Sequence, residues 1–339
     1  MARKIKDAVI VITGASSGIG RATAIRLAEQ GARVLAVARR LDALDDLRDQ
    51  CRNAPGLIIP VGADVTSEAA LQEVAELALE NFGRLDAWIN NAAVSLFANF
   101  EEAPSQVYRQ VLETNLFGYI YGARAALPIF REQGTGTLIN VSSMVARLGS
   151  PFISAYVTSK AAINGLTRSL RQEFRHTDIK ICLVMPASID TPLFQQAANF
   201  TGRAVQPLEP VYDPNIVSDQ ILRLLKRPTP EVYAGNAGRF LTGLRRLIPR
   251  TVERFTARQV EQDHFQERSA PPSTGNLFRP TPQMARVDGG WNGKKRLLRR
   301  PAARLAITGA LLAIPTALLL FSSPTPLPDR SWLQNLLPG

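Results

Sequence analysis

The chain has 339 residues, 45% of them hydrophobic, which is enough for one large α/β domain or two smaller ones. Two cysteines cannot build a disulfide framework, and the two histidines, His176 and His264, lack metal-ligand spacing; we interpret both histidines as ordinary surface or helix residues. The net charge of +11 lies in the C-terminal third, because residues 223–304 carry 18 Lys and Arg against 6 Asp and Glu, whereas residues 1–222 carry 21 against 22. This asymmetry indicates an acidic partner, such as anionic lipid or nucleic acid.

Through the first two hundred residues, short apolar runs alternate with segments whose apolar residues recur every three or four positions. Strands that alternate with helices predict a doubly wound α/β fold, in which a parallel sheet has helices on both faces. Ligands of such sheets bind at the carboxyl ends of the strands, so functional motifs are expected just after them. The predicted strands are Ala8–Thr13, Arg33–Ala38, Leu57–Val61, Ala87–Asn90, Thr137–Val141 and Lys180–Met185, and the clearest helices are Ile19–Gln30 and Leu71–Phe82.

The pattern changes after residue 200. A helix is predicted at Ile216–Leu225, and Phe240–Thr256 is amphipathic, with Pro249 as an interruption. Ser269–Gly293 is rich in Pro, Gly, Ser and Asn, a composition typical of a flexible linker. We therefore predict a catalytic domain over 1–225, a helical extension over 226–268, a flexible basic linker over 269–301, a transmembrane or membrane-associated helix over 302–323, and a short tail over 324–339.

A glycine-rich turn, Thr13–Gly20, stands between the first predicted strand and the first predicted helix. Gly14, Gly18 and Gly20 permit a tight turn and let the backbone approach a pyrophosphate, an anion that a helix N-terminus favours. Glycine patterns alone are weakly specific, but this strand–turn–helix context is the one that a dinucleotide site requires. The turn therefore predicts dinucleotide binding.

The end of the second strand, Ala36–Arg40, predicts which dinucleotide is bound. An acidic residue there would accept hydrogen bonds from a ribose 2′-hydroxyl and repel a 2′-phosphate. Ala38 stands at that place instead, followed by Arg39 and Arg40, whose guanidinium groups pair well with phosphate. We therefore predict NADP(H). If the arginines are only solvated loop charges, the cofactor is NAD(H).

A third group of residues predicts acid–base chemistry. Tyr156 and Lys160 are four residues apart, so they lie on one face of a helix. The charge of the lysine is expected to lower the pKa of the phenol toward neutral pH. Ser143, just after a predicted strand, offers a hydroxyl that can hold a substrate oxygen, and Ser142 is the alternative. A Tyr-x-x-x-Lys pair occurs by coincidence in many helices, so its weight comes from its order relative to the other motifs.

With these motifs, roughly residues 5–195 resemble the short-chain dehydrogenase/reductase family, of the type with a single Rossmann domain. The resemblance implies hydride transfer between a nicotinamide and a carbonyl or alcohol carbon, with Tyr156 as acid/base and Lys160 tuning it and binding the nicotinamide ribose. Ser143, thirteen residues before Tyr156, matches the substrate-orienting serine, and Asn115 matches the asparagine that supports a water-linked proton relay. The cofactor-binding residues that we predict are Gly14, Ser16, Ser17, Gly18, Ile19, Gly20, Arg39, Arg40, Asp64, Val65, Asn91, Ala92, Tyr156, Lys160, Pro186, Ile189 and Thr191.

One position departs from the family pattern. After the sixth strand the family commonly has Pro-Gly, whereas this chain has Pro186 and Ala187. Alanine removes some backbone freedom, so we expect a change in the local loop geometry. The chemistry is expected to be unaffected, because Pro186, Ile189 and Thr191 are retained.

An uncharged stretch, Leu305–Ser323, predicts attachment to a membrane. As a helix it approaches the apolar thickness of a bilayer, about 30 Å. Basic residues cluster over 294–304, just before it, which would keep the enzyme on the cytoplasmic face. Pro315 weakens a straight span, so a helix inserted from one side, or packed on protein, stays open. Phe240–Thr256 could lie on the same membrane surface, although such a helix is more often a lid or a packing element.

The sequence thus predicts an NADP(H)-dependent oxidoreductase acting on a small carbonyl or alcohol substrate, apolar if it is met at a membrane. Nucleic acid is not expected as a partner, because no recognition motif accompanies the charge. A homo-oligomer is compatible with the sequence, and no metal is predicted. Two alternatives stay open: an NAD(H)-dependent alcohol dehydrogenase, and a non-catalytic nucleotide-binding regulatory protein of the same fold. The second is disfavoured because all four residues Asn115, Ser143, Tyr156 and Lys160 are present.

Overall fold

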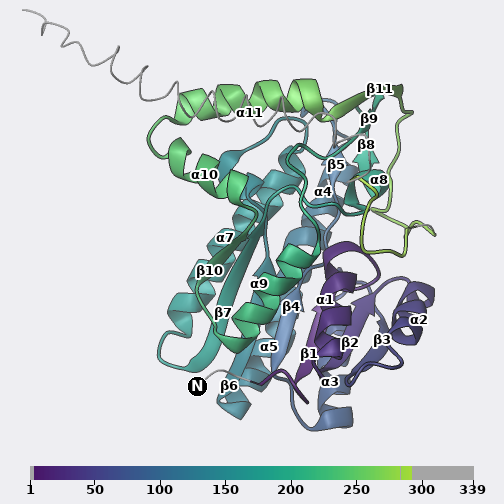
Figure 1. Cartoon of the computed structure of the whole chain (residues 1–339), viewed down its shortest axis with the longest axis vertical. Coiled ribbons are helices and arrows are strands. Elements are labelled where there is room, and N and C mark those ends of the chain that lie inside the picture. Colours follow the sequence, from purple (N-terminus) through teal and green to yellow (C-terminus); the bar gives the residue numbers. More distant parts are fainter. Residues whose placement is uncertain (1–3, 283, 292–339) are drawn as a thin grey trace, which may run out of the picture. The chain divides into compact units, whose positions relative to one another are not determined.

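The computed structural model describes residues 4–282 and 284–291, and a seven-stranded sheet forms the centre of this part of the chain (Figure 1). All neighbouring strands in this sheet are parallel. From β1 the chain adds β2 and β3 on one side, and it then continues with β4 on the other side of β1. Sheets of this kind bind ligands at this switch point, beyond the carboxyl ends of the strands. In sheet order the strands are β10 (Glu231–Ala234), β7 (Asp178–Pro186), β6 (Thr135–Val141), β4 (Ala87–Asn90), β1 (Val9–Thr13), β2 (Arg33–Ala38) and β3 (Leu57–Gly62).

The predicted parallel α/β fold is confirmed, and the six predicted strands agree with the observed ones to within two residues at each end. The strand β10 is not predicted. It lies in the segment expected to be helical, and Val232 pairs with Val184 of β7. Four residues are too few for a hydrophobic alternation to stand out from the surrounding sequence, which explains the omission.

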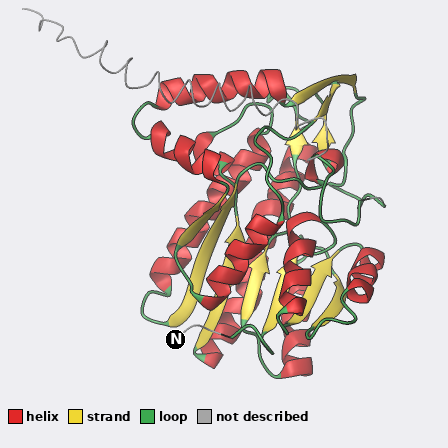
Figure 2. Ribbon diagram, viewed as in Figure 1, coloured by secondary structure: helices red, strands yellow, loops and turns green. Residues whose placement is uncertain are grey.

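Helices cover both faces of the sheet (Figure 2). Because successive side chains of a strand point to opposite faces, Ile10 and Ile12 of β1 join one buried cluster with Leu27 of α1, whereas Val9 and Val11 join another with residues of α3 and α5. The helices of the domain are α1 (Gly18–Glu29), α2 (Leu41–Gln50), α3 (Glu68–Phe82), α4 (Ser105–Leu112), the π-helix η1 (Glu113–Phe117), α5 (Gly118–Gln133), α6 (Val145–Leu148), α7 (Ser154–Glu173), α8 (Leu193–Gln196) and α9 (Asn215–Lys226).

The extension adds two helices, α10 (Asn236–Arg245) and α11 (Pro249–Asp263), and α11 lies across the end of the molecule toward which the strands run (Figure 1). The amphipathic pattern at 240–256 is therefore two helices. Pro249 begins the second one, in the first turn where a missing N–H costs nothing. Two small sheets complete this end, β5 (Leu96–Phe97) with β8 (Ala198–Asn199) and β9 (Arg203–Val205) with β11 (Phe265–Ser269).

Residues 270–291, with 283 not described, form an irregular segment that we call the strap. Although its composition is typical of a flexible linker, its backbone is held by the domain. Leu277 is fully buried, the carbonyl of Arg286 accepts a hydrogen bond from Gly18 N at 2.9 Å, and Asp190 Oδ1 accepts from the backbone N–H groups of Gly289 and Trp291 at 2.8 and 3.1 Å. Composition did not indicate this, because the groups that fix the strap lie far away in the sequence.

Among the described residues, no helix is both long and apolar enough to cross a membrane. The predicted membrane helix at 302–323 lies outside the described residues, so the anchor has no support from the structure and stays a prediction.

Candidate active site

The glycine-rich turn joins β1 to α1 at the switch point of the sheet. Gly14 and Gly18 have φ of +69° and +57°, a region that favours glycine. A Cβ at Gly20 would lie 2.2 Å from the carbonyl oxygen of Gly14, so this helix packs against its own turn only with glycine there. The turn is tied to the end of β4, because Asn91 Nδ2 donates to the carbonyl of Thr13 at 2.9 Å and Thr13 Oγ1 accepts from the N–H of Asn91 at 3.0 Å.

A cavity of about 360 Å³ opens at this end of the sheet. Its wall joins the glycine-rich turn, the ends of several strands, the strap and the extension. Of the predicted site residues, two do not line it: Gly20, which packs on the turn, and Asn115, which lies behind the wall. Those that line it are Gly14, Ser16, Ser17, Gly18, Ile19, Arg39, Arg40, Asp64, Val65, Asn91, Ala92, Ser143, Tyr156, Lys160, Pro186, Ile189 and Thr191.

The two arginines after β2 contact the strap as well as the cavity. Arg39 donates hydrogen bonds to the carbonyls of Asn276 and Leu277 at 2.5 and 3.1 Å. Arg40 donates to the carbonyls of Thr281 and Pro282, both at 2.8 Å, and burial lowers its pKa. They are therefore not the solvated loop charges of the alternative interpretation, since Arg40 is only 8% exposed and both hold a neighbouring segment.

Asn115 lies in η1, where the helix widens by one residue per turn, a distortion that is frequent at functional sites. Its side chain is fully engaged. The amide oxygen accepts from the N–H of Val94 at 2.8 Å, and Nδ2 donates to the carbonyl of Val94 at 2.9 Å and to Ser159 Oγ at 3.1 Å. Asn115 thus connects the segment after β4 to α7, the helix that carries Tyr156 and Lys160.

Tyr156 lies half-buried on the cavity wall, and Ser143 lines the same wall close enough to lower the pKa of its hydroxyl group. Burial raises the pKa of Tyr156 to about 12, an effect that outweighs the lowering by Ser143. The lowering that the sequence predicts from Lys160 is not found here. At neutral pH the phenol is protonated and can donate.

Lys160 explains that difference. Its Nζ lies 5.6 Å from the centre of the Tyr156 ring but donates to the hydroxyl of Tyr119 at 3.0 Å and to the carbonyl of Val141 at 2.8 Å. Burial lowers the pKa of Lys160 to about 7, which weakens its positive charge at neutral pH. Motif spacing did not point to Tyr119, because it is 41 positions away from Lys160 and contacts it only in the folded chain.

Pro186–Thr191 contains the departure from Pro-Gly. The side chain of Ala187 faces Gly235, which has φ of +109° and where an added Cβ would lie 2.6 Å from that of Ala187. The methyl group of Ala187 therefore has room because residue 235 is a glycine and has no side chain. Asp190, fully buried, anchors the strap beside Thr191, which also lines the cavity.

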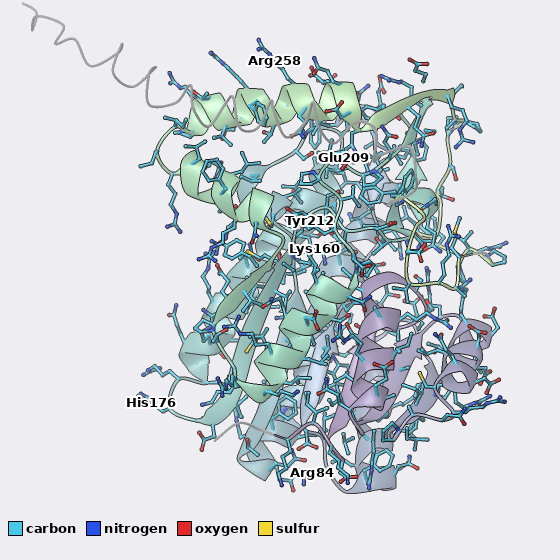
Figure 3. All side chains as sticks on the ribbon, viewed as in Figure 1. Arg84, Lys160, His176, Glu209, Tyr212 and Arg258 are labelled. Carbon is cyan, nitrogen blue, oxygen red and sulfur yellow. The ribbon has the colours of Figure 1, made fainter. Side chains whose placement is uncertain are left out.

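The histidine interpretation needs one correction. His176 is exposed and lies well away from Lys160 (Figure 3), as expected of a surface residue. His264, directly after α11, is instead only 4% exposed and lines the cavity. Its ring meets Phe97 and Phe194 edge to face, with centroids 5.0 and 5.9 Å apart. The local sequence around His264 is polar and gives no sign of this burial, which depends on segments far away in the chain.

Comparisons with known proteins agree with this geometry. A family model described as short chain dehydrogenase matches residues 8–201. An uncharacterized oxidoreductase of Bacillus subtilis, YxnA, is 36% identical over 276 residues, which cover 80% of this chain and 77% of that protein. The 3-oxoacyl-[acyl-carrier-protein] reductase FabG of Thermotoga maritima is 31% identical, over 65% of this chain and 91% of that protein.

A solved structure extends the comparison. A short chain dehydrogenase/reductase from Burkholderia phymatum in complex with NAD has a TM-score of 0.67 and 25% sequence identity, with 74% of this chain and 96% of that one covered. The family model and the relatives assign the chain that forms this parallel sheet, glycine-rich turn and cavity to one family. The chain belongs to the short chain dehydrogenase family and is an oxidoreductase of that family.

Proposed function

We propose that this protein is an NADP(H)-dependent reductase of an apolar carbonyl compound, with Tyr156 as the proton donor. The observation that carries the proposal is the position of the Tyr156 hydroxyl, protonated at neutral pH, on a cavity wall that also contains Ser143 and the glycine-rich turn. A proton donor and an oxygen-binding hydroxyl side by side are what a carbonyl oxygen needs as it gains electrons.

The cavity fits a dinucleotide. The backbone of the glycine-rich turn and the N-terminus of α1 face it, and Asp64 and Val65 lie after β3 on the same wall. When bound, the cofactor supplies the hydride. Ser143 holds the substrate oxygen, Tyr156 donates the proton to that oxygen, and Lys160 with Asn115 keeps the tyrosine side of α7 in place. Reduction begins from the protonated form of Tyr156, which is the form present at neutral pH in the cofactor-free protein.

The substrate region supports an apolar compound. Side chains of Phe97, Leu148, Ile153, Phe194 and Leu241 line the cavity, and Phe97, Ile153 and Phe194 belong to the same apolar cluster as Tyr156. Burying apolar substrate surface against them contributes about 25 cal/mol per Å².

Replacement of Tyr156 by Phe tests the mechanism. We expect turnover to be lost while NADPH binds as before, because the hydroxyl alone is removed. Tyr108→Phe is the matched control: its hydroxyl lies 3.4 Å from Thr158 Oγ1 and it does not line the cavity. Unchanged turnover in Tyr156→Phe would contradict the proposal. A protein that binds NADPH and turns over no carbonyl compound with Tyr156 intact would favour the non-catalytic alternative.

The choice of NADP(H) rests on Ala38 and the two arginines that follow it at the cavity wall. The guanidinium group of Arg39 has five N–H donors, and it gives one to each of two strap carbonyls, so it can also donate to a 2′-phosphate. The same hydrogen bonds favour a second candidate, NAD(H), because they give the arginines a structural reason to be there.

Dissociation constants of NADPH and NADH for the wild type and Arg39→Ala separate the two cofactors. The cofactors differ only in the 2′-phosphate, so a loosened strap weakens both alike, whereas a lost phosphate contact weakens NADPH alone. We expect NADPH binding to fall about 10- to 100-fold, the size of a lost charge-assisted hydrogen bond. Equal weakening of both cofactors would support NAD(H).

Membrane attachment through 302–323 and assembly into a homo-oligomer are further proposals. The first depends on the apolar stretch and the basic residues that precede it. Carbonate extraction of membranes that contain the full-length chain checks the first, and complete release would exclude an anchor. Light scattering of the released protein checks the second.

A further inference from the structure

His264 stands where the extension closes the cavity. Its backbone N–H donates to the carbonyl of Val260 at 3.0 Å, and its own carbonyl accepts from the N–H of Gln206 at 2.9 Å, so its position is fixed from two sides. Of the polar side chains that α11, the residue after it and the 206–210 segment bring to the cavity, Glu209 is exposed and Thr256 and Gln259 are half-buried, whereas His264 is buried. Figure 3 shows Glu209 beside α11.

The hydrogen bonding of the ring fixes its tautomer. Nδ1 of His264 contacts the carbonyl oxygen of Gln206, and because a carbonyl only accepts, Nδ1 carries the proton. Burial lowers the pKa of His264 to about 4, so the ring is neutral at physiological pH. Nε2 then bears a lone pair and is an acceptor. Within residues 4–282 and 284–291 no protein group donates to it.

Aromatic side chains surround the ring of His264, so Nε2 is a polar acceptor in a largely apolar part of the cavity wall. Phe97 and Phe194 meet the ring edge to face, and Phe97 belongs to the same apolar cluster as Tyr156. His264 and the proposed proton donor therefore line the same cavity. Nε2 is the acceptor that His264 offers on the cavity wall, so a ligand that supplies a donor there gains a hydrogen bond. A site built to hydrogen-bond a hydroxyl discriminates strongly against an analogue that lacks one.

We propose that Nε2 of His264 accepts a hydrogen bond from a hydroxyl group of the substrate, remote from the reacting carbonyl. The substrate class is then an apolar carbonyl compound with a hydroxyl at its far end. This inference rests on the proposed reductase function and deepens it. His264 is a specificity-determining residue, not part of the proton transfer.

Three variants of the full chain, loaded with NADPH, test it. His264→Asn keeps an N–H near the position of Nδ1, and so the contact with Gln206, but has no acceptor near Nε2. His264→Gln places an amide oxygen near Nε2, and His264→Phe removes both groups. The probes are phenylbutanone and its para-hydroxyphenyl analogue, which differ only in the distal hydroxyl.

In the wild type we expect kcat/KM to favour the hydroxylated ketone by roughly 3- to 10-fold, the value of one net hydrogen bond. In the Asn and Phe variants we expect the ratio of the two kcat/KM values to fall toward one, and in the Gln variant part of the preference to return. A ratio that is the same in the wild type and His264→Phe overturns the inference and leaves the reductase function standing. A ratio retained in His264→Asn shows that His264 only positions Gln206, which also overturns it.

A second measurement is independent of turnover. Proton–nitrogen correlation NMR of the imidazole reports its tautomer, and we expect the proton on Nδ1 at neutral pH. A proton on Nε2 overturns the inference even if neither ketone is reduced. Absence of turnover of both ketones by the wild type, with the proton on Nδ1, counts against the proposed function instead.

Discussion

Nζ of Lys160 donates a hydrogen bond to the hydroxyl of Tyr119 at 3.0 Å. The same hydroxyl donates to the carbonyl of Val141 at 2.9 Å, and Lys160 donates to that carbonyl at 2.8 Å, so the three groups form a closed triangle. Tyr119 and Lys160 are both fully buried. The triangle links α5, α7 and β6 directly behind Tyr156 and sets the position from which Lys160 can act.

Tyr119→Phe removes one corner of the triangle. We expect kcat to fall roughly 3- to 10-fold and its pH profile to shift, because Lys160 loses an acceptor and moves relative to Tyr156. The free energy of unfolding should fall by about 1–2 kcal/mol, since a buried N–H loses its partner. Steady-state kinetics across pH and urea denaturation measure the two effects. Tyr121→Phe, on the same helix, is the control, and equal pH profiles for the two variants would contradict a positioning role.

The pKa of Lys160 predicts a dependence of stability on pH. Burial lowers it to about 7 in the folded state from 10.5. Between these values the unfolded chain binds more protons at this residue than the folded chain, so the free energy of unfolding rises with pH. We expect a rise between about pH 7 and pH 10 of at most about 1.4 kcal/mol per unit. Urea denaturation without cofactor measures it. Lys160→Met should flatten the rise and Lys180→Met should not; an equal slope in both variants would refute this assignment.

Two glycines predict opposite effects of the same substitution. A Cβ at Gly122 of α5 would lie 2.3 Å from Asn90 Oδ1 and 2.6 Å from Trp88 Nε1, both buried. Gly122→Ala is therefore expected to lower the free energy of unfolding by about 1–3 kcal/mol. Gly165 of α7 has no atom within 4 Å of the position of a Cβ, so Gly165→Ala should raise it by about 0.5–1 kcal/mol. Thermal denaturation compares the two, and stabilisation by Gly122→Ala would show that Asn90 and Trp88 do not fill the space beside Gly122.

The strap predicts an effect on cofactor affinity. Leu277 is fully buried and its carbonyl accepts from Arg39, whereas its neighbour Phe278 is 41% exposed. Leu277→Ala should loosen the strap and weaken binding of both NADPH and NADH, roughly 3- to 10-fold, because the strap walls the cavity near Arg39. Phe278→Ala is the control and should bind both as the wild type does. Isothermal titration calorimetry measures the affinities of both variants. Unchanged affinity in Leu277→Ala would show that the strap does not contribute to cofactor binding.

The part of the site that could be predicted from the sequence is the part built by local geometry. The glycine-rich turn follows from its strand and helix, and the Tyr156–Lys160 pair follows from one turn of α7. What could not be predicted depends on contacts between distant segments. The polar stretch around His264 gives no sign that its ring meets Phe97, 167 positions earlier, and the strap is fixed by arginines more than two hundred positions away.

The pKa of Tyr156 is the clearest case of a local rule that fails. Spacing places the lysine close to the phenol, and a nearby positive charge lowers a phenol pKa. The structure shows burial of both groups, which raises the pKa of Tyr156 and lowers that of Lys160. Desolvation depends on the whole cavity and therefore cannot be derived from a spacing.

The position of β10 has a practical consequence. The family match ends at residue 201, yet β10 at Glu231–Ala234 forms the outermost strand of the sheet and covers the edge of β7. A protein shortened to the matched region would expose the N–H and C=O groups of β7 along that edge. Bare edges of this kind recruit strands from other molecules, so such a truncated protein is expected to aggregate, and a soluble shortened form should extend past 234.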